Sequence, residues 1–521
     1  MTGSSGPSGP GGSAPEPSTL RRELSRVDTI FFLISAMVAV DTIGAIAIGG
    51  GQAFTWLLVL FLFFFVPSAL ASAELGAAIP EEGGPYVWVR MAFGRLAGAT
   101  TSLLYWAGTP LWLGGSLTVV AIAVFERFYG HLGTGGAYLF GTLFVGGATL
   151  GAVLPLRWGK WLPSSGAIGQ MVLLASFTGS VVAYGILHGV HGIALGGFAP
   201  SYGAFIAVVP VLLYSFVGIE LPSTAAEEMV DPRRDIPVAI GRAGVGQILM
   251  YAVPILAVLV VLPAEQVSSL HGLIDAMRNV FTVYGGSIAP DGSVTLTGAG
   301  SVLGLASAAL FIWVLLASGA AWIMGAGRTQ AAACRDGAGP AVLGRISRRS
   351  GVPVVMGLVS GGVSLVTMVA YLTATGGDGQ RYFSVGLTVA IALIVLSYLL
   401  IFPAFVALRV RRPELERPFR VPGGIRTAWL VSAVATGWSL LAAACLLWPG
   451  FGSSNPDAAL PAGFEGQRMT FELLVLCPIA VLLPVSVGFY LLGRPSARRQ
   501  DDIHAGRLAA VATAQAARAP Q

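Results

Sequence analysis

The sequence predicts an all-α polytopic membrane protein with about twelve transmembrane helices. Apolar residues make up 55% of the 521-residue chain and charged residues only 11%, which leaves too little polar surface to cover a soluble globule of this size. Apolar runs of roughly 20 residues, long enough to cross a bilayer, recur along the chain and are separated by Pro, Gly and Arg. The bilayer is therefore the main solvent that we expect for this protein.

Hydropathy alone places the expected spans. They lie at residues 28–50, 53–79, 97–125, 137–156, 165–187, 202–229, 237–262, 299–326, 353–373, 383–409, 427–448 and 470–492. We expect a transmembrane domain at 27–492 between two cytoplasmic tails, a disordered one at 1–26 and a second at 493–521. After Arg494 the chain is expected to form either a short amphipathic helix on the membrane or a disordered segment. The polar segment 263–298 is predicted to be an outer-face loop whose short helices pack over the bundle.

Arginine and lysine are distributed unevenly between alternate loops. With the N-terminus inside, most of them fall in inner segments. The outer loops hold few, namely Arg127, Arg278, Arg381 and Arg468. Because positively charged loops stay on the cytoplasmic side, this asymmetry predicts an even number of spans with both termini in the cytoplasm of a bacterial cell.

Charge and cysteine content argue against several other classes of protein. The net charge of +5 comes from arginines scattered between apolar runs, so we expect no nucleic-acid partner. The three cysteines are too far apart for a CxxC motif, and His188 and His191 have no third ligand nearby. The sequence therefore indicates no metal, no cofactor and no catalytic residue.

Two expected spans contain interruptions. In the first span, DTIGAIAIGG (41–50) places the carboxylate of Asp41 and several glycines where a helix should be continuous and apolar. In the sixth, YSFVGIELP (214–222) combines Gly218, Glu220 and Pro222, and proline removes a backbone donor. Both segments are candidates for unwound helix; the alternative is that they are kinks in ordinary packed helices.

Paired interruptions at equivalent positions of two five-span repeats, here about 28–187 and 202–409, indicate a substrate site near the bilayer midplane. Unwound helix ends offer N–H groups to a carboxylate and carbonyls to an ammonium, so an amino acid fits both. Ionisable groups in hydrocarbon are costly, which makes Asp41 and Glu220 functional candidates. For Glu74, near the end of the second span, a structural ion pair and a transport role both remain open.

Four motifs resemble the amino acid-polyamine-organocation superfamily. YSFVGIELPSTAAEEMVDPRRDIP (214–237) is similar to its sixth-helix signature, an F-x-G-x-E core followed by N/D-P-x-R-x-[IVY]-P. The others are ALASAELGAAIPEEGGPYVWVRMAFG (69–94), WIMGAGRTQAAACRDGAGP (322–340) and RPFRVPGG (417–424). Together with the hydropathy, the resemblance covers about residues 25–492, and EEGG and RPFRVPGG look most like the glutamate:GABA antiporter branch.

The resemblance implies a leucine-transporter-like fold of two inverted five-span repeats, with spans eleven and twelve added at about 427–492. It implies substrate contacts in the first span at Gly44, Ala45 and Ile46. Asp41 and Ile43, in the same interrupted segment, are further candidate contacts. In the sixth span the resemblance implies substrate contacts at Ser215, Phe216, Val217 and Gly218, an aromatic lid at Tyr214 and a proton-sensitive gate at Glu220. The alternative for Glu220 is a permanent hydrogen-bond bridge.

This chain departs from the family pattern at several points. Ile46 stands where the family usually has glycine, which reshapes the expected carboxylate pocket. The fifth span lacks the lysine that serves as a fixed cation in some proton-coupled members, and Gln170 lies nearby instead. The tail after span twelve shows no counterpart of the long plug of the glutamate:GABA antiporters.

We therefore expect a secondary transporter, a permease or antiporter, that carries an amino acid or related amine by alternating access. The matched site positions hold no Arg or Lys, so neutral substrates and amines are favoured over acidic ones. Protons are candidate coupling ions, and a homodimer is compatible with this architecture. The stretch DPRRDIP (231–237) is expected to latch to Glu81, Glu82 or Arg328, or to be a solvated loop against anionic lipid. Alternative functions are an ion channel and a membrane-embedded enzyme.

Overall fold

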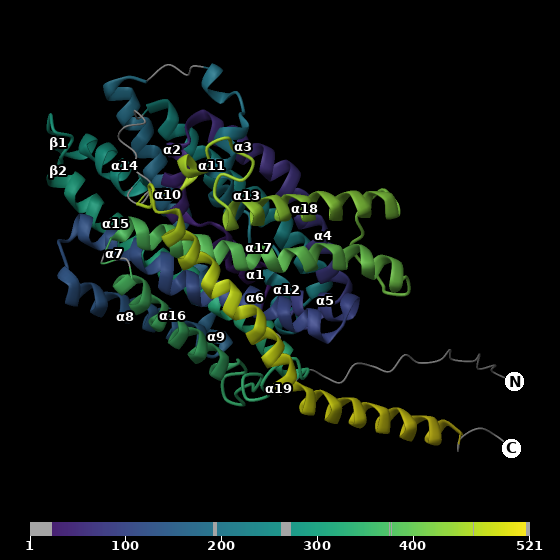
Figure 1. The fold of residues 1–521 in the computed structure, drawn as a ribbon. Helices are drawn as coiled ribbons and strands as arrows, with labels where there is room; N and C mark the ends of the chain where they lie inside the picture. Colours follow the sequence, from purple (N-terminus) through teal and green to yellow (C-terminus); the bar gives the residue numbers. More distant parts are fainter. Residues whose placement is uncertain are drawn as a thin grey trace, which may run out of the picture.

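The computed structural model describes residues 23–190, 195–261, 272–374, 376, 378–461 and 463–516, and most of them are helical (Figure 1). Within these ranges ten helices are long and apolar enough to cross a membrane. The first and sixth predicted spans are not among the ten because each is divided into shorter pieces. The expectation of an all-α membrane bundle with two broken spans is confirmed.

The first five predicted spans correspond to the elements from α1 to α10. These are α1 (Arg26–Met37), the 3₁₀ turn η1 (Val40–Thr42), α2 (Ile43–Ile48), α3 (Gly50–Leu60), the π-helical turn η2 (Phe61–Phe65), α4 (Val66–Ala78), α5 (Pro85–Phe93), α6 (Arg95–Trp112), the π-helical turn η3 (Leu113–Leu117), α7 (Thr118–Phe128), α8 (Gly133–Val153), α9 (Leu156–Gly159) and α10 (Trp161–His188). The third span is thus built from α6, η3 and α7 in continuous succession.

The next five predicted spans include a loop segment with its own secondary structure. The elements are η4 (Leu195–Phe198), α11 (Tyr202–Tyr214), α12 (Leu221–Thr224), η5 (Ala226–Glu228), α13 (Pro232–Val261), α14 (Gly272–Phe281), η7 (Thr282–Tyr284), β1 (Gly286–Ile288), β2 (Val294–Leu296), α15 (Gly298–Arg335), α16 (Val354–Ala374) and α17 (Gly379–Arg411). The predicted short helix in the loop 263–298 is α14, which packs against α2 and α10. The antiparallel hairpin of β1 and β2 was not predicted.

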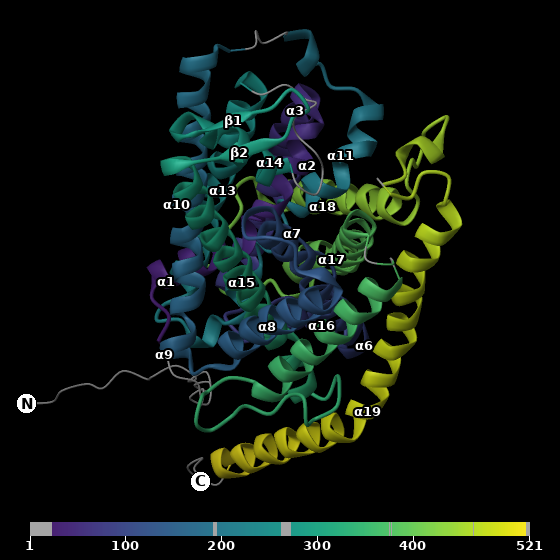
Figure 2. The same cartoon turned by 90° about the vertical axis from the view of Figure 1, so that its left-hand side faces the viewer.

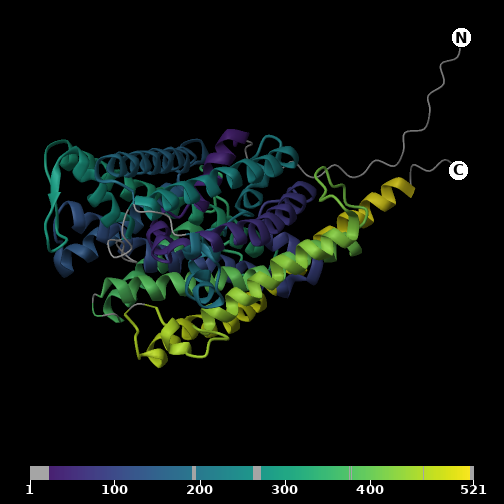
Figure 3. The same cartoon turned by 90° about the horizontal axis from the view of Figure 1, so that it is seen from above.

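The last spans are α18 (Gly424–Leu447) and α19 (Arg468–Ala516), with the short turn η8 (Pro456–Ala459) between them. Figures 2 and 3 show α19 at the outside of the bundle. This helix continues without interruption past the end of its membrane-compatible part at Ala497, so the expected tail begins as a helical extension of the last span. Of the predicted tails, residues 1–22 and 517–521 lie outside the described residues.

The two ends of the bundle differ in charge. We call the end that carries Arg26, Arg90, Arg335 and Arg409 the basic face. The other end, which carries α14 and the β1–β2 hairpin, is the opposite face. In Figure 1 the hairpin lies at the left and α5 and α12 lie at the right, so the two faces are separated along the length of the spans.

Candidate functional site

The first span is interrupted directly after α1. The chain leaves the helix at Met37 and becomes extended at Val38, whose φ and ψ are −86° and 94°, before the turn η1 and helix α2. The break was predicted within 41–50, but the fully unwound residues, Val38 and Ala39, lie just before that range. Within the range, residues 43–48 form a regular helix, and a second interruption follows at Gly49 and Gly50, where Gly50 has a φ of +63°. Asp41 lies in the turn immediately after the unwound residues.

Side chains from three other spans bond to the backbone groups at this break. Gln170 of α10 donates to the carbonyls of Ser35 and Val38, at 3.2 and 2.8 Å. The Trp322 indole of α15 donates to the carbonyl of Ala36 at 2.8 Å. Because buried backbone groups must be hydrogen-bonded, these partners allow the helix to open at residues that are not glycine.

Helix α13 contributes two further partners and joins the two breaks. The Tyr251 hydroxyl accepts a hydrogen bond from the Ala39 amide at 2.8 Å. The Gln247 amide donates to the carbonyl of Met37 at 3.2 Å and also to the carbonyl of Ser215 in the sixth span. One side-chain amide therefore bridges the two interrupted spans.

The sixth span is interrupted between α11 and α12, as predicted from its Gly and Pro. Gly218 has a φ of +98°, which side-chain-bearing residues rarely adopt, and a Cβ there would lie 2.9 Å from the Trp322 ring. The Tyr398 hydroxyl of α17 accepts from the Gly218 amide at 3.0 Å and donates to the Glu220 carboxylate at 3.0 Å. Tyr398 thus links the break to the predicted gate residue.

The other predicted contact residues mainly contribute packing. Ile43 and Ile46 are buried in the core, as is Val217. A Cβ on Gly44 would meet the backbone of α14 at 2.5 Å, so this glycine permits close packing of α2 against α14. Phe216 packs in tilted contacts against Phe61 and Phe65, at ring-centroid distances of 6.0 and 5.7 Å.

Two residues named in the sequence analysis are described only in part or not at all. Of Ala45 only the backbone is described, within helix α2. His191 lies outside the described residues, whereas the His188 ring lies 3.2 Å from the carbonyl oxygen of Tyr184.

Asp41 is a buried carboxylate of which neither oxygen has a hydrogen-bond partner within the described part of the chain. Two polar side chains of α6 share this property, the Thr109 hydroxyl and the Trp112 indole N–H, whereas the Tyr105 hydroxyl of the same helix is hydrogen-bonded to the Glu220 carboxylate. The spacing of three residues between Thr109 and Trp112 places them on one face of the helix. Since buried polar atoms are nearly always bonded, such a group of unpaired atoms indicates a place for a polar ligand.

Aromatic rings connect Asp41 to this face of α6. Tyr214 lies beside Asp41, and its ring centroid is 6.1 Å from that of Trp112. The Trp322 ring lies 6.3 Å from Trp112 and 6.2 Å from Tyr105. Tyr214 and Trp322 are only 5% and 3% exposed, so the region is closed to solvent. A carboxylate beside an aromatic ring, with further rings packed behind it, has the chemistry that binds an organic cation.

The buried carboxylates of the basic face, by contrast, all have cationic partners. Glu228 forms a two-point ion pair with Arg328, at 2.9 and 3.2 Å, and both side chains are 2% exposed. Glu74 pairs with Arg409 and accepts a hydrogen bond from the Val421 amide at 2.7 Å. This geometry supports the structural role for Glu74 rather than a transport role.

The stretch 231–237 is joined to the bundle by partners other than those predicted. Asp235 pairs with Arg26 at 2.6 Å, and Arg233 pairs with Glu416 at 2.6 Å. Its expected partners are engaged elsewhere, Glu81 with Arg90, Glu82 with Arg335 and Arg328 with Glu228. The predicted latch partners are therefore wrong, because the fold brings Arg26 and Glu416, both more than 180 residues away in the chain, closer to this stretch.

Glu82, in the loop before α5, is 4% exposed. Burial raises the pKa of its carboxyl to about 7, although the neighbouring Arg335 acts to lower this pKa. Glu228 is a second carboxylate nearby and adds to the increase. This carboxyl therefore changes charge near neutral pH.

Sequence reasoning missed the side chains that hold the breaks open, namely Gln247, Tyr251, Trp322 and Tyr398. Gln247 carries a signal that could have been used, because an amide in an otherwise apolar span needs an internal partner. The aromatic residues carry no such signal, since Tyr and Trp are common in spans for packing alone.

Known proteins agree with this architecture. Over 407 residues the chain is 27% identical to the probable agmatine/putrescine antiporter AguD of Lactococcus lactis, covering 77% of this chain and 83% of that protein. It is 28% identical over 433 residues to an uncharacterized transporter of Legionella pneumophila, covering 78% and 87%. Its fold is similar to the crystal structure of the Eremococcus coleocola manganese transporter, with a TM-score of 0.55, 14% identity and coverage of 94% and 97%.

Residues 24–462 match the amino acid permease family, which is most of the chain. The finer resemblance to the glutamate:GABA antiporter branch stays a prediction. The matched region contains both interrupted spans, the carboxylates Asp41 and Glu220 and the aromatic residues around them. The chain therefore belongs to the amino acid permease family of the amino acid-polyamine-organocation superfamily, and it is a secondary transporter of amino acids or amines.

Proposed function

We propose that the protein carries a cationic amine, or an amino acid bound through its amino group, and that Asp41 receives the substrate ammonium. The observation that carries this proposal is the pairing of the buried carboxylates. Those at the basic face have arginine partners, whereas both oxygens of Asp41 are unpaired within the described residues. A substrate ammonium would supply the missing charge.

The surroundings of Asp41 support an ammonium ligand. Tyr214, Trp112 and Trp322 offer ring faces that attract an organic cation, and this attraction is stronger where water is excluded. Tyr214 keeps its predicted role as a lid over the substrate. AguD, one of the relatives, is described as an antiporter of agmatine and putrescine, which are both cationic amines.

The bonded state of the first break favours amines over zwitterionic amino acids. The Ala39 amide and the carbonyls of Ala36, Met37 and Val38 already have side-chain partners. Recognition in this conformation therefore relies on side chains, above all on one anionic group. In this proposal residues 43–46 shape the site through the packing of α2, and residues 215–218 form its wall in the sixth span.

Glu220 is the proposed proton-sensitive gate. It is 1% exposed, and its hydrogen-bond partners are the neutral hydroxyls of Tyr398 and Tyr105 rather than a cation. A buried carboxyl without a cationic partner changes protonation more readily than one in an ion pair. Loss or gain of its proton would alter the hydrogen bonds that hold the second break.

The basic face is proposed to lie in the cytoplasm of a bacterial cell, with both termini there, in accordance with the positive-inside rule. Two inverted repeats, at about 28–187 and 202–409, would then rock around the two breaks in alternating access. We propose transport without chemical change of the substrate.

The test is counterflow in proteoliposomes loaded with putrescine, agmatine, a neutral amino acid or glutamate. We expect exchange of the amines and little exchange of glutamate. Asp41→Asn should weaken the apparent affinity for amines by about 10- to 100-fold, the usual effect of losing a buried charged hydrogen bond.

Asp457→Asn removes an exposed carboxylate of the opposite face and serves as the matched control, with wild-type affinity expected. Asp41→Asn should be at least as heat-stable as the wild type, because it removes an unpaired buried charge. Wild-type amine affinity in Asp41→Asn, or glutamate exchange as fast as amine exchange, would refute the proposal.

A further inference from the structure

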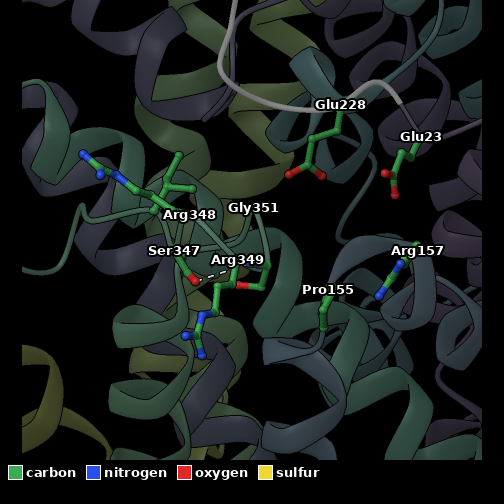
Figure 4. A pocket seen from close by; sticks show the side chains of 10 residues that line it. Glu23, Pro155, Arg157, Glu228, Ser347, Arg348, Arg349 and Gly351 are labelled. Atoms are coloured by element: carbon green, nitrogen blue, oxygen red, sulfur yellow. Dashed lines mark hydrogen bonds between the residues drawn. The ribbon is translucent and has the colours of Figure 1, made fainter.

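A pocket opens on the basic face, away from the central site. Its volume is about 600 Å³, and its walls include Arg157 after α8, the loop 346–351 after α15, and Glu23 and Glu228. Figure 4 shows Glu23, Glu228 and Arg157 on one side of the pocket and Arg348 and Arg349 on the other. Segments that are far apart in sequence thus meet around one space.

The charge of this pocket is unbalanced. Arg157, Arg348 and Arg349 are exposed, and none of them pairs with a carboxylate among the described residues. Glu228 is already neutralised by Arg328 at 2.9 Å, which leaves Glu23 as the one unpaired carboxylate described in the wall. Three guanidinium groups against one free carboxylate favour an anion.

The loop that carries two of the arginines is held in a defined turn. The Gly351 amide donates to the Ser347 carbonyl at 2.8 Å, and the Ser347 amide donates to the Val352 carbonyl at 3.0 Å. The buried hydroxyl of Ser350, which also lines the pocket, has no hydrogen-bond partner within the described chain. A hydroxyl and guanidinium groups together match the acceptor oxygens of a phosphate.

Two tryptophans place the pocket at the depth of lipid headgroups. Trp158 and Trp161, at α9 and the start of α10, are 62% and 66% exposed. Tryptophans exposed at the ends of spans occupy the membrane–water interface. The Arg157 guanidinium lies 5.8 Å from the centre of the Trp158 ring, so one wall of the pocket lies at that depth.

We infer that this pocket is a binding site for a phosphate-bearing anion, presented by the headgroup of an anionic phospholipid of the adjacent leaflet. The choice of leaflet rests on the proposed orientation of the basic face. The binding chemistry is independent of that orientation. Basic pockets on the cytoplasmic side of membrane proteins bind such headgroups.

The pocket lies where the segment before α1 joins the end of the sixth span. The amides of Glu23 and Leu24 both donate to the Glu228 carbonyl at 3.0 Å, and Leu24 pairs with Met229. The pocket is therefore walled by the segment before α1 and by the end of the sixth span in their joined arrangement. A headgroup bound there stabilises this arrangement.

The test measures binding of fluorescent phosphatidylglycerol to the purified full-length protein in a neutral detergent, with phosphatidylcholine as the uncharged comparison. R157Q/R348Q/R349Q should bind phosphatidylglycerol about 100-fold more weakly, since each arginine near an anionic headgroup contributes about a factor of five. R242Q/R420Q/R426Q removes three exposed arginines outside the pocket, none paired with a carboxylate among the described residues, and should retain wild-type binding.

Inorganic phosphate, titrated alone and as a competitor, distinguishes the source of the anion. Arginine-dependent binding of the lipid with weak competition supports a headgroup site. Strong, arginine-dependent binding of inorganic phosphate supports the same site with a soluble ligand. Equal losses in the two triple variants, or no loss in either, overturns the inference. Equal thermal stability of both variants without lipid verifies folding, and the amine counterflow assay is independent of this result.

Discussion

The buried carboxylates of the centre and those of the basic face differ in one respect, their partners. Glu228 at the basic face has a bidentate arginine at hydrogen-bond distance, whereas Asp41 in the centre has no partner within the described residues and Glu220 has a tyrosine hydroxyl. A buried ion pair fixes one arrangement of the segments that it joins. An unpaired buried carboxylate is costly and is retained where it binds or exchanges a cation.

The largest effect is expected where a complete pair is broken. Arg328→Gln leaves Glu228 buried without its cation, which should lower the free energy of unfolding by about 3–5 kcal/mol. Thermal unfolding of the purified protein in detergent measures this loss. The double variant E228Q/R328Q removes both charges and should recover most of the stability, so an equally unstable double variant would contradict the ion-pair interpretation.

A smaller effect is expected at the second break, where a neutral hydroxyl replaces the cation. Tyr398→Phe removes the group that accepts from Gly218 and donates to Glu220, at a cost of about 1–3 kcal/mol for the polar atoms left unpaired. The same unfolding measurement applies. Tyr202→Phe loses a hydroxyl bonded to the Phe451 carbonyl at the exposed opposite face and should change stability by no more than about 0.5 kcal/mol. Equal losses of stability in the two variants would show that the Tyr398 hydroxyl does not stabilise the second break.

The two breaks also differ in how far the sequence predicts their positions. Hydropathy located the spans, and the combination of Gly218, Glu220 and Pro222 located the second break, because these residues act on their own backbone. The first break was misplaced toward the glycines near Gly44. Its position depends on Gln170 and Gln247, which lie more than a hundred residues away and donate to its carbonyls. Such partners are set by tertiary packing, which local sequence patterns do not report.

Helix α19 and the hairpin of β1 and β2 illustrate the same limit. The polar segment 263–298 was predicted to pack over the bundle, which α14 confirms, but its polar residues do not distinguish a helix from a hairpin. The continuation of α19 beyond the last span was likewise hidden, since an Ala- and Arg-rich tail is compatible with several conformations.

A pH-dependent effect is expected from a carboxylate that shares features of both regions. Glu82 has an arginine partner in Arg335, yet one of its oxygens is unpaired among the described residues, and burial raises its pKa to about 7. Glu228 and Arg328 face it from the end of the sixth span and from α15, and its own amide is bonded to the Glu227 carboxylate at 3.3 Å. The charge of Glu82 therefore changes near neutral pH.

The sign of the pH effect follows from the direction of this shift. Between the ordinary pKa of 4.5 and about 7, the folded protein holds a proton on Glu82 that the unfolded chain has released. Stability therefore falls as pH rises through this window and levels off above it, with a slope of at most about 1.4 kcal/mol per pH unit. Glu82→Gln should lose this contribution, so unfolding temperatures from pH 5 to 8 should fall less steeply than in the wild type. Glu414→Gln, an exposed carboxylate of the same face, should keep the wild-type slope, and identical slopes in all three proteins would place Glu82 with the fully paired carboxylates.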